Sequence, residues 1–256
     1  MAITETARRN HDELFPDRIS TLAQTDPELI EIFDNFAFDE TLRDGGLDTR
    51  TRLMVQLAAL ISGQALSEYR VMLGAALTVG VTPVEAKEIL YQAVPYAGMG
   101  KVFDFIHATN EILSQRGVQL PLHGQAATTP ATRAGKGRAV RERITGTDRT
   151  EAMYASAADD ELHFQQFLSA NCFGDYYTRG GIDVRTRELL TFAMLVSLGG
   201  CDPQVKGHVA ANLNVGNGRQ ALISVTTALL PFIGYPRTLN ALAAIDEIAP
   251  ASKERQ

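Results

Sequence analysis

A glutamate, a cysteine and a histidine lie near one another in the C-terminal half of the chain, at Glu188, Cys201 and His208. A carboxylate and an imidazole can relay a proton, and a thiol can act as a nucleophile beside them. Cys201 directly precedes Asp202 and Pro203, which are typical of a helix start. The positive end of the helix dipole is expected there to make the thiol ionise more readily than a free one. These three are the predicted catalytic residues.

Each of the three residues also has an ordinary structural explanation. A cysteine before a helix is often a small buried side chain. A glutamate in a first helical turn interacts favourably with the helix dipole, and a histidine can be a hydrogen-bonded core residue. The residue types alone therefore leave both explanations open.

The chain contains an internal repeat that serves as a control. The segment GGLDTRTRLMVQLAALISG, which begins at Gly45, is repeated as GGIDVRTRELLTFAMLVSLGG from Gly180. GAALTVG, which ends at Gly80, corresponds in the same way to AANLNVG, which ends at Gly216, so the second half carries one inserted residue. Order, spacing and residue type agree over most of both halves, which indicates two copies of one structural unit.

The three candidate residues are absent from the first copy as a set. Where the second half has Glu188, Cys201 and His208, the first half has Leu53, Ala65 and Met72. Helix packing alone does not require the three groups to be lost together. This pattern favours a duplicated site that only the second half has kept, although sequence drift also produces such a pattern.

The elements that must position these residues are predicted to be helices. Apolar residues cover more than one face of Arg185–Leu198, as in a helix buried inside a bundle, and Asp183 is its expected N-cap. The next helix is expected to start at Pro203, with Asp202 as its cap, and to stop at Gly216. Further helices are predicted over Asp159–Phe173, Asn217–Leu230 and Pro236–Ile248.

The predicted fold is all-α, with two tandem helical bundles, because no segment keeps the alternation of a strand. The first repeat is assigned to residues 1–122 and the second to residues 133–256. A stretch rich in Pro, Gly, Ala and Thr separates them, with the linker itself at residues 123–132.

Composition favours a small-molecule or protein partner. A net charge of -6 gives no attraction for nucleic acid or an anionic membrane surface. No apolar run is long enough to span a membrane, and the N-terminal residues lack a secretory signal, so we expect a cytoplasmic protein. His11, His107 and His123 share no metal-ligand spacing, and no phosphate-binding glycine loop occurs, so neither metal nor organic cofactor is expected.

Four stretches of the second half carry a resemblance to a known family: GRAVRERITG, FGDYYTRGGIDVRTRELLTFAMLVSLGG, KGHVAANLNVG and PFIGYPRTLNAL. They resemble the carboxymuconolactone decarboxylase family, whose fold is the helical bundle shared with alkyl hydroperoxidase D. The resemblance implies a cofactor-independent lyase that acts on a small lactone carrying a carboxylate. His208 would then be the acid–base group, with Glu188 orienting it. The substrate carboxylate would be held by a cation, for which the candidates are Arg179, Arg185 and Arg187.

A peroxidase branch of the same family is the alternative. It is known for a Cys-x-x-Cys-x-x-x-His signature, whose first cysteine and histidine match Cys201 and His208. Gln204 stands where the second thiol would be, and Glu188 is one residue out of the spacing of that branch. A disulfide cycle is thereby excluded, and what remains is a one-cysteine thiol peroxidase with peroxiredoxin activity. A third reading is a non-catalytic small-molecule binder or scaffold.

The resemblance also implies an assembly. Single-repeat decarboxylases of this family form hexameric rings, so a chain with two repeats is expected to close a similar ring as a homotrimer.

Overall fold

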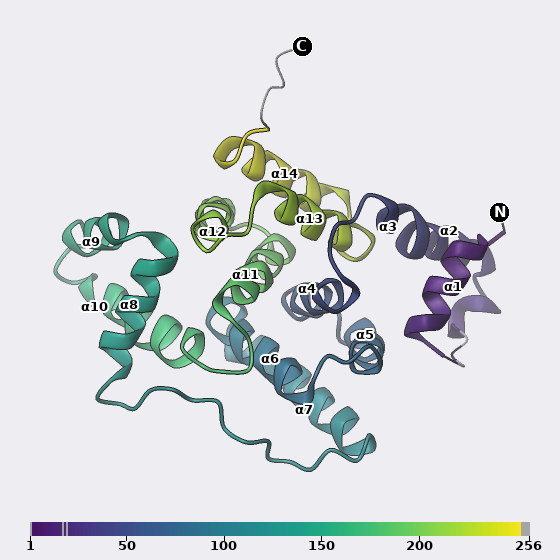
Figure 1. Ribbon diagram of the computed structural model, residues 1–256, viewed down its shortest axis with the longest axis horizontal. Coiled ribbons are helices and arrows are strands. Elements are labelled where there is room, and N and C mark those ends of the chain that lie inside the picture. The colour runs from purple at the N-terminus through teal and green to yellow at the C-terminus, as the bar shows by residue number, and fades with distance from the viewer. Residues whose placement is uncertain (1, 17, 19, 252–256) are drawn as a thin grey trace.

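The structure, a computed structural model, describes residues 2–16, 18 and 20–251, and these residues form helices and loops without a strand (Figure 1). The prediction of an all-α chain built from two repeats is therefore confirmed. The elements of the first half are α1 (Glu5–Leu14), a 3₁₀ turn (Thr21–Ala23), α2 (Pro27–Asn35), a π-helical segment (Phe36–Glu40), α3 (Thr41–Arg43), α4 (Thr49–Ser62), α5 (Leu66–Thr78), α6 (Pro83–Ala97) and α7 (Met99–Gln115). Those of the second half are α8 (Arg133–Thr145), α9 (Thr147–Ala155), α10 (Leu162–Phe167), a π-helical segment (Leu168–Tyr177), α11 (Val184–Leu198), α12 (Asp202–Asn214), α13 (Arg219–Ile233) and α14 (Tyr235–Ile248).

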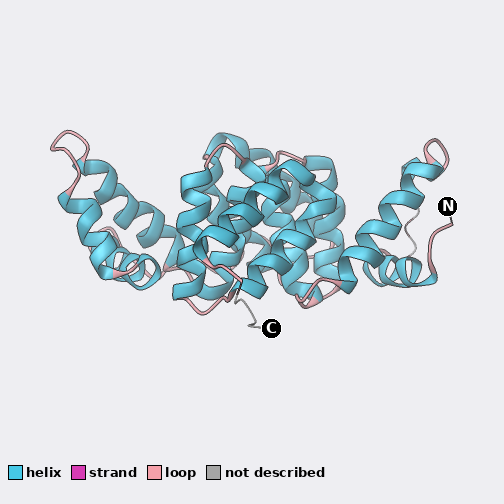
Figure 2. Ribbon diagram, turned by 90° about the horizontal axis from the view of Figure 1, so that it is seen from above, coloured by secondary structure: helices cyan, strands magenta, loops and turns pink. Residues whose placement is uncertain are grey.

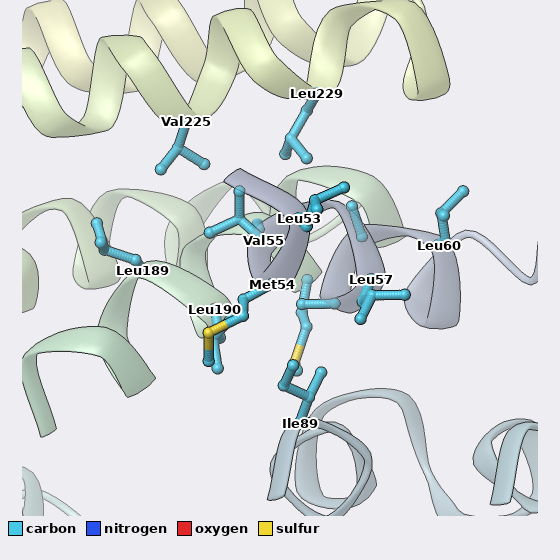
Figure 3. Packing of buried hydrophobic residues seen from close by; sticks show 14 of the residues in the cluster. Leu53, Met54, Val55, Leu57, Leu60, Ile89, Leu189, Leu190, Val225 and Leu229 are labelled. Carbon is cyan, nitrogen blue, oxygen red and sulfur yellow. The ribbon is translucent and has the colours of Figure 1, made fainter. Parts of the chain in front are cut away.

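The two repeats share one hydrophobic core. Helices α4 and α11, which occupy equivalent places in the two halves, pack against each other at its centre. Figure 3 shows leucines of both helices, among them Leu53, Leu57 and Leu190, beside Val225 of α13 and Ile89 of α6. All five are 0–1% exposed. The halves therefore stabilise each other by burying a common apolar surface.

A helical arm projects from each side of this central body (Figure 2). One arm contains α1 to α3, and the other contains α8 to α10 with the π-helical segment that follows. In the second arm α8 lies very close to the π-helical segment, because a Cβ on Gly137 would stand only 1.9 Å from the carbonyl oxygen of Ser169. Only glycine allows this approach, which holds the π-helical segment beside α8.

The helix bounds agree in part with the sequence-based predictions. Asp183 caps α11 as expected, since its side chain accepts a hydrogen bond from the backbone N–H of Thr186. The predicted start of the following helix was wrong: α12 begins at Asp202, and Cys201 is its N-cap residue, without a capping hydrogen bond. The helix predicted over Asp159–Phe173 is instead the short α10 followed by the π-helical segment. The spacing of apolar residues in the sequence does not reveal the wider turns of a π-helix.

The connection between the repeats has no helix between Gln115 and Arg133, in agreement with the expected loop. The exact boundaries at residues 122 and 133 stay predictions. In the described part of the chain, no helix combines the length and apolar character needed to cross a membrane.

Candidate active site

Two of the predicted site residues, Glu188 and His208, are in contact between α11 and α12. The Nδ1 of His208 lies 2.8 Å from Oε2 of Glu188. Glu188 is completely buried, whereas the side chain of His208 keeps 16% of its surface exposed. Asn212 ties the two helices together at this point by donating its amide to the carbonyl oxygens of both Glu188 and His208. With Nδ1 directed at the carboxylate, Nε2 is the ring nitrogen left for a ligand.

Two tyrosines complete the surroundings of the buried carboxylate. The Tyr177 hydroxyl donates to Oε1 of Glu188 at 2.6 Å and lies 2.8 Å from the hydroxyl of Thr191. The hydroxyl of Tyr96 lies 3.0 Å from that of Tyr177, and its ring meets the His208 imidazole edge to face, with centroids 5.6 Å apart. Burial raises the pKa of Tyr96 and of Tyr177 well above the ordinary tyrosine value, so both stay neutral hydroxyls.

Tyr96 belongs to α6 of the first repeat, so both halves build the site. The site is thus divided between the repeats, as the hydrophobic core is. The second repeat supplies the Glu188 carboxylate and the His208 imidazole, and the first supplies the Tyr96 ring against which the imidazole packs.

His208 opens onto a pocket of about 550 Å³. This volume lies within the range of ordinary small-molecule sites. The walls are mainly apolar, with Leu195 and Leu198 on one helix and Phe173 on the arm. The remaining lining residues come from α6, the arm and α12: Pro95, Tyr96, Arg141, Thr145, Arg149, Met153, Leu168, Cys172, Cys201, Pro203, Gln204, Gly207, His208 and Ala211.

Cys201 reaches the same pocket but does not have the expected ionisation. Its Sγ donates a hydrogen bond to the carbonyl oxygen of Leu195 at 3.3 Å. Burial, and then the charge of Asp202, raise the pKa of the Cys201 thiol. The prediction of a readily formed thiolate was therefore wrong, because desolvation and an adjacent carboxylate outweigh the helix dipole. Cys172, the other free cysteine, is more deeply buried, which raises its pKa to about 12.

None of the three arginines predicted to bind substrate lines this pocket. Arg187 is fully buried and bonds to Glu88 and Gln92 of α6. Arg179 pairs with the same Glu88 through Nε and Nη2. Arg185 donates to the side chain of Asn217.

The structural role of two of these arginines could have been recognised in the repeat. Arg185 corresponds to Arg50 and Arg187 to Arg52, so the half without the catalytic set keeps both. Arg50 donates to the carbonyl oxygen of Gly80, which corresponds to Gly216, the residue directly before Asn217. The two arginines therefore bind the same loop of their respective repeats. Residues that both halves retain are therefore expected to hold the fold.

The first half has a smaller pocket of about 270 Å³ at the corresponding place. Phe38 lines it where Phe173 lines the larger one, and Val71 lies where the second half has Gly207. The proton relay is missing there because Leu53 and Met72, both buried, take the places of Glu188 and His208.

Tyr177 and Tyr96 were not identified from the sequence. The repeat holds a signal for Tyr177, because it corresponds to Leu42 and so follows the same polar-to-apolar change as Glu188. Tyr96 corresponds to Phe232 and lies in the half without the catalytic set, so only the three-dimensional arrangement shows its role. Among the described residues, no cluster of three or more His, Cys, Asp or Glu side chains is arranged to hold a metal ion.

Comparison with known proteins places these observations in context. The profile of the Carboxymuconolactone decarboxylase family matches residues 27–111 and 163–247, one match in each repeat. A 4-carboxymuconolactone decarboxylase of Acinetobacter baylyi is 27% identical over 113 residues, which are 44% of this chain and 84% of that protein. A crystal structure described as a gamma-carboxymuconolactone decarboxylase subunit of Burkholderia xenovorans aligns with a TM-score of 0.51 at 19% identity, over 93% of this chain and 95% of the other. That structure supports the fold.

Proposed function

Because this chain belongs to the carboxymuconolactone decarboxylase family, we propose that it removes a carboxylate, as carbon dioxide, from a small unsaturated lactone. The observation that carries the proposal is the hydrogen-bonded pair of Glu188 and His208 at the end of a pocket of ligand size. The first repeat has the pocket without the pair, which argues that the pair serves the reaction rather than the fold.

In the proposed reaction, a proton replaces the carboxylate on a ring carbon of the lactone, and the carboxylate leaves as carbon dioxide. The bond between the ring carbon and the carboxylate breaks, carbon dioxide leaves, and the electron pair is delocalised into the unsaturated lactone. His208 then donates the proton of Nε2 to carbon, and solvent restores that proton. Each turnover consumes one lactone carboxylate and one proton and requires no change of oxidation state in the protein.

Glu188 is proposed to orient the imidazole. Its Oε2 lies 2.8 Å from Nδ1 of His208, and the hydroxyl of Tyr177 donates to its other oxygen, which holds the carboxylate in place. In this scheme Cys201 is a neutral thiol in the pocket wall, since its proton is held toward the Leu195 carbonyl.

The thiol peroxidase is the second candidate, because Cys201 and His208 line one pocket. The raised pKa of the Cys201 thiol weakens this candidate, since the thiolate is the form that attacks peroxide. A non-catalytic binder would use the same pocket without turnover.

One assay of the purified protein separates the three candidates. The substrate is 4-carboxymuconolactone, the compound in the name of the Acinetobacter relative. Release of one carbon dioxide per lactone, without peroxide or thiol, supports the decarboxylase. Peroxide consumption sustained by a thiol reductant, without lactone turnover, supports the peroxidase. Saturable lactone binding without either reaction supports the binder.

We also propose a homotrimer in the cytoplasm. Both cysteines are free thiols, which suits a reducing compartment. The trimer is supported by exposed apolar side chains that occur at equivalent places in both repeats, such as Leu29 and Phe164.

A further inference from the structure

We propose that Arg149 binds the carboxylate that the substrate keeps through the reaction, as distinct from the one that leaves as carbon dioxide. The inference rests on the proposed decarboxylation. It assigns a specificity-determining residue that lies far from the predicted arginines in the sequence.

The pocket favours an anion. Its described lining residues include the side chains of Arg141, Arg149 and His208 but no aspartate or glutamate. Glu188 lies behind the imidazole, fully buried and paired with it. A ligand that enters therefore meets cationic groups without an acidic residue among the walls.

The two arginines differ in their partners, since in the described part of the chain Arg141 is bound by neighbouring residues and Arg149 is not. Arg141 is 1% exposed, and its guanidinium donates to the backbone and side chain of Gln165 and to Ser169. These bonds fasten α8 to α10 and to the π-helical segment that follows it. Arg149, in contrast, is exposed on α9 and forms no hydrogen bond or ion pair with any residue that the structure describes.

The guanidinium of Arg149 lies over the helix that carries His208. Its Nη2 is 3.5 Å from the position of a Cβ built on Gly207, the residue directly before His208. The first repeat has Val71 at the position of Gly207, where the branched side chain would occupy this space. The active half thus has a glycine where the free cation approaches the histidine.

The retained carboxylate is the one that this cation suits. A carboxylate that leaves becomes neutral carbon dioxide, so its charge is weaker in the transition state than in the bound substrate. A cation paired with it would stabilise the substrate more than the transition state and slow the reaction. Apolar walls such as Leu195 and Leu198 suit the departing group, whereas Arg149 can hold a charge that persists throughout.

The test combines kinetics with binding of unreactive probes. The variant is Arg149→Gln, and the matched control is Arg143→Gln, which changes an exposed arginine of the same arm outside the pocket. With 4-carboxymuconolactone, Arg149→Gln is expected to raise KM at least about tenfold with little change in kcat, because a charge-assisted contact of equal strength in both states is lost. Arg143→Gln is expected to resemble the wild type. A fall in kcat at unchanged KM would overturn the proposal.

Adipate and hexanoate, of equal chain length with two carboxylates and one, test the binding step by calorimetry. The wild type is expected to bind adipate more tightly, and Arg149→Gln is expected to bind both equally. Equal binding by the wild type, or a preference that persists in the variant, contradicts the role of Arg149. If the wild type does not turn over lactone, the proposed function fails, and the probe comparison still decides whether Arg149 binds the second carboxylate.

Discussion

At the scale of single residues, the hydroxyl of Tyr177 is the contact through which the arm acts on the proton relay. It donates to the carboxylate oxygen of Glu188 that His208 does not use. A hydrogen bond to a buried charged group contributes about 1.5–3 kcal/mol. The orientation of the Glu188 carboxylate therefore depends on a residue outside α11 and α12.

We expect Tyr177→Phe to lower kcat about tenfold. Part of the hydrogen-bond energy is lost equally in the substrate complex and in the transition state, and a remaining difference of about 1.4 kcal/mol corresponds to one tenfold step in rate. KM should change little because Tyr177 does not line the pocket. Steady-state kinetics on the lactone provides the measurement. Phe173→Leu, which alters the pocket wall, is the contrasting variant and should act mainly on KM. Unchanged kcat in Tyr177→Phe would argue against this positioning role.

The thiol of Cys201 provides a test that depends on pH. Because burial and Asp202 raise its pKa, the thiolate should form only at a pH above the ordinary cysteine value. Alkylation of Cys201 should therefore be slow at neutral pH and rise steeply in alkaline solution. Mass spectrometry of the labelled peptides measures the rates, and Cys172, with a pKa of about 12, should remain unlabelled in the folded protein. Rapid labelling of Cys201 at neutral pH would favour the peroxidase.

At the scale of elements, the contact between α8 and the π-helical segment holds the second arm together. A Cβ on Gly137 would lie 1.9 Å from the Ser169 carbonyl oxygen and 2.5 Å from the Gly174 nitrogen. Gly135 lies in the same helix, with nothing within 4 Å of its Cβ position. The two glycines thus separate the effect of close packing from the effect of a glycine in a helix.

Gly137→Ala is expected to lower the free energy of unfolding by about 1–3 kcal/mol, because the two segments must move apart. Gly135→Ala should leave it unchanged or raise it by up to about 1 kcal/mol, since alanine is the better helix former. Urea denaturation measures both. Activity should also fall in Gly137→Ala, because Tyr177 lies on the displaced segment. Equal stability of the two variants would contradict the packing account.

The sequence predicted most of the helices and two of the site residues, but it did not reveal contacts between distant segments. The caps and apolar spacing that predict α11 are local features of the sequence. The comparison of the two repeats also needs only the sequence, and it distinguished Glu188 and His208. The sequence did not show that the three arginines lie outside the pocket, because their partners are distant in the chain: Arg187 bonds to Glu88 and Gln92 of the other repeat. Tyr96 was missed for the same reason. Burial also decides the Cys201 thiol, and no local pattern shows how deeply that side chain lies.

At the scale of the whole molecule, exposed apolar side chains are duplicated with the repeat. On the arms, Leu29 and Ile32 of α2 correspond to Phe164 and Phe167 of α10. On the body, Met99 and Phe103 of α7 correspond to Tyr235 and Leu239 of α14. All eight side chains are 50–60% exposed. Apolar residues that both copies keep on the surface indicate contact surfaces, and the duplication suits a ring in which the halves alternate.

We expect the protein to have the native mass of three chains, since each chain presents both kinds of surface on both of its halves. Phe164→Ser with Phe167→Ser should weaken the assembly and leave the fold of the chain intact, because both side chains point to solvent. Native mass spectrometry and light scattering measure the change, and circular dichroism checks the fold. Phe103→Ser is a comparison for the body surface. A monomeric wild type would rule out the trimer.

The central claim is that His208 supplies the proton that replaces carbon dioxide, and the turnover number of His208→Ala on 4-carboxymuconolactone tests it most directly. His107→Ala, which removes an exposed histidine outside the pocket, is the control. We expect kcat of His208→Ala to fall about 10²–10⁴-fold, the usual contribution of a general acid, and kcat of His107→Ala to match the wild type. A His208→Ala protein that turns over the lactone at the wild-type rate would contradict the account.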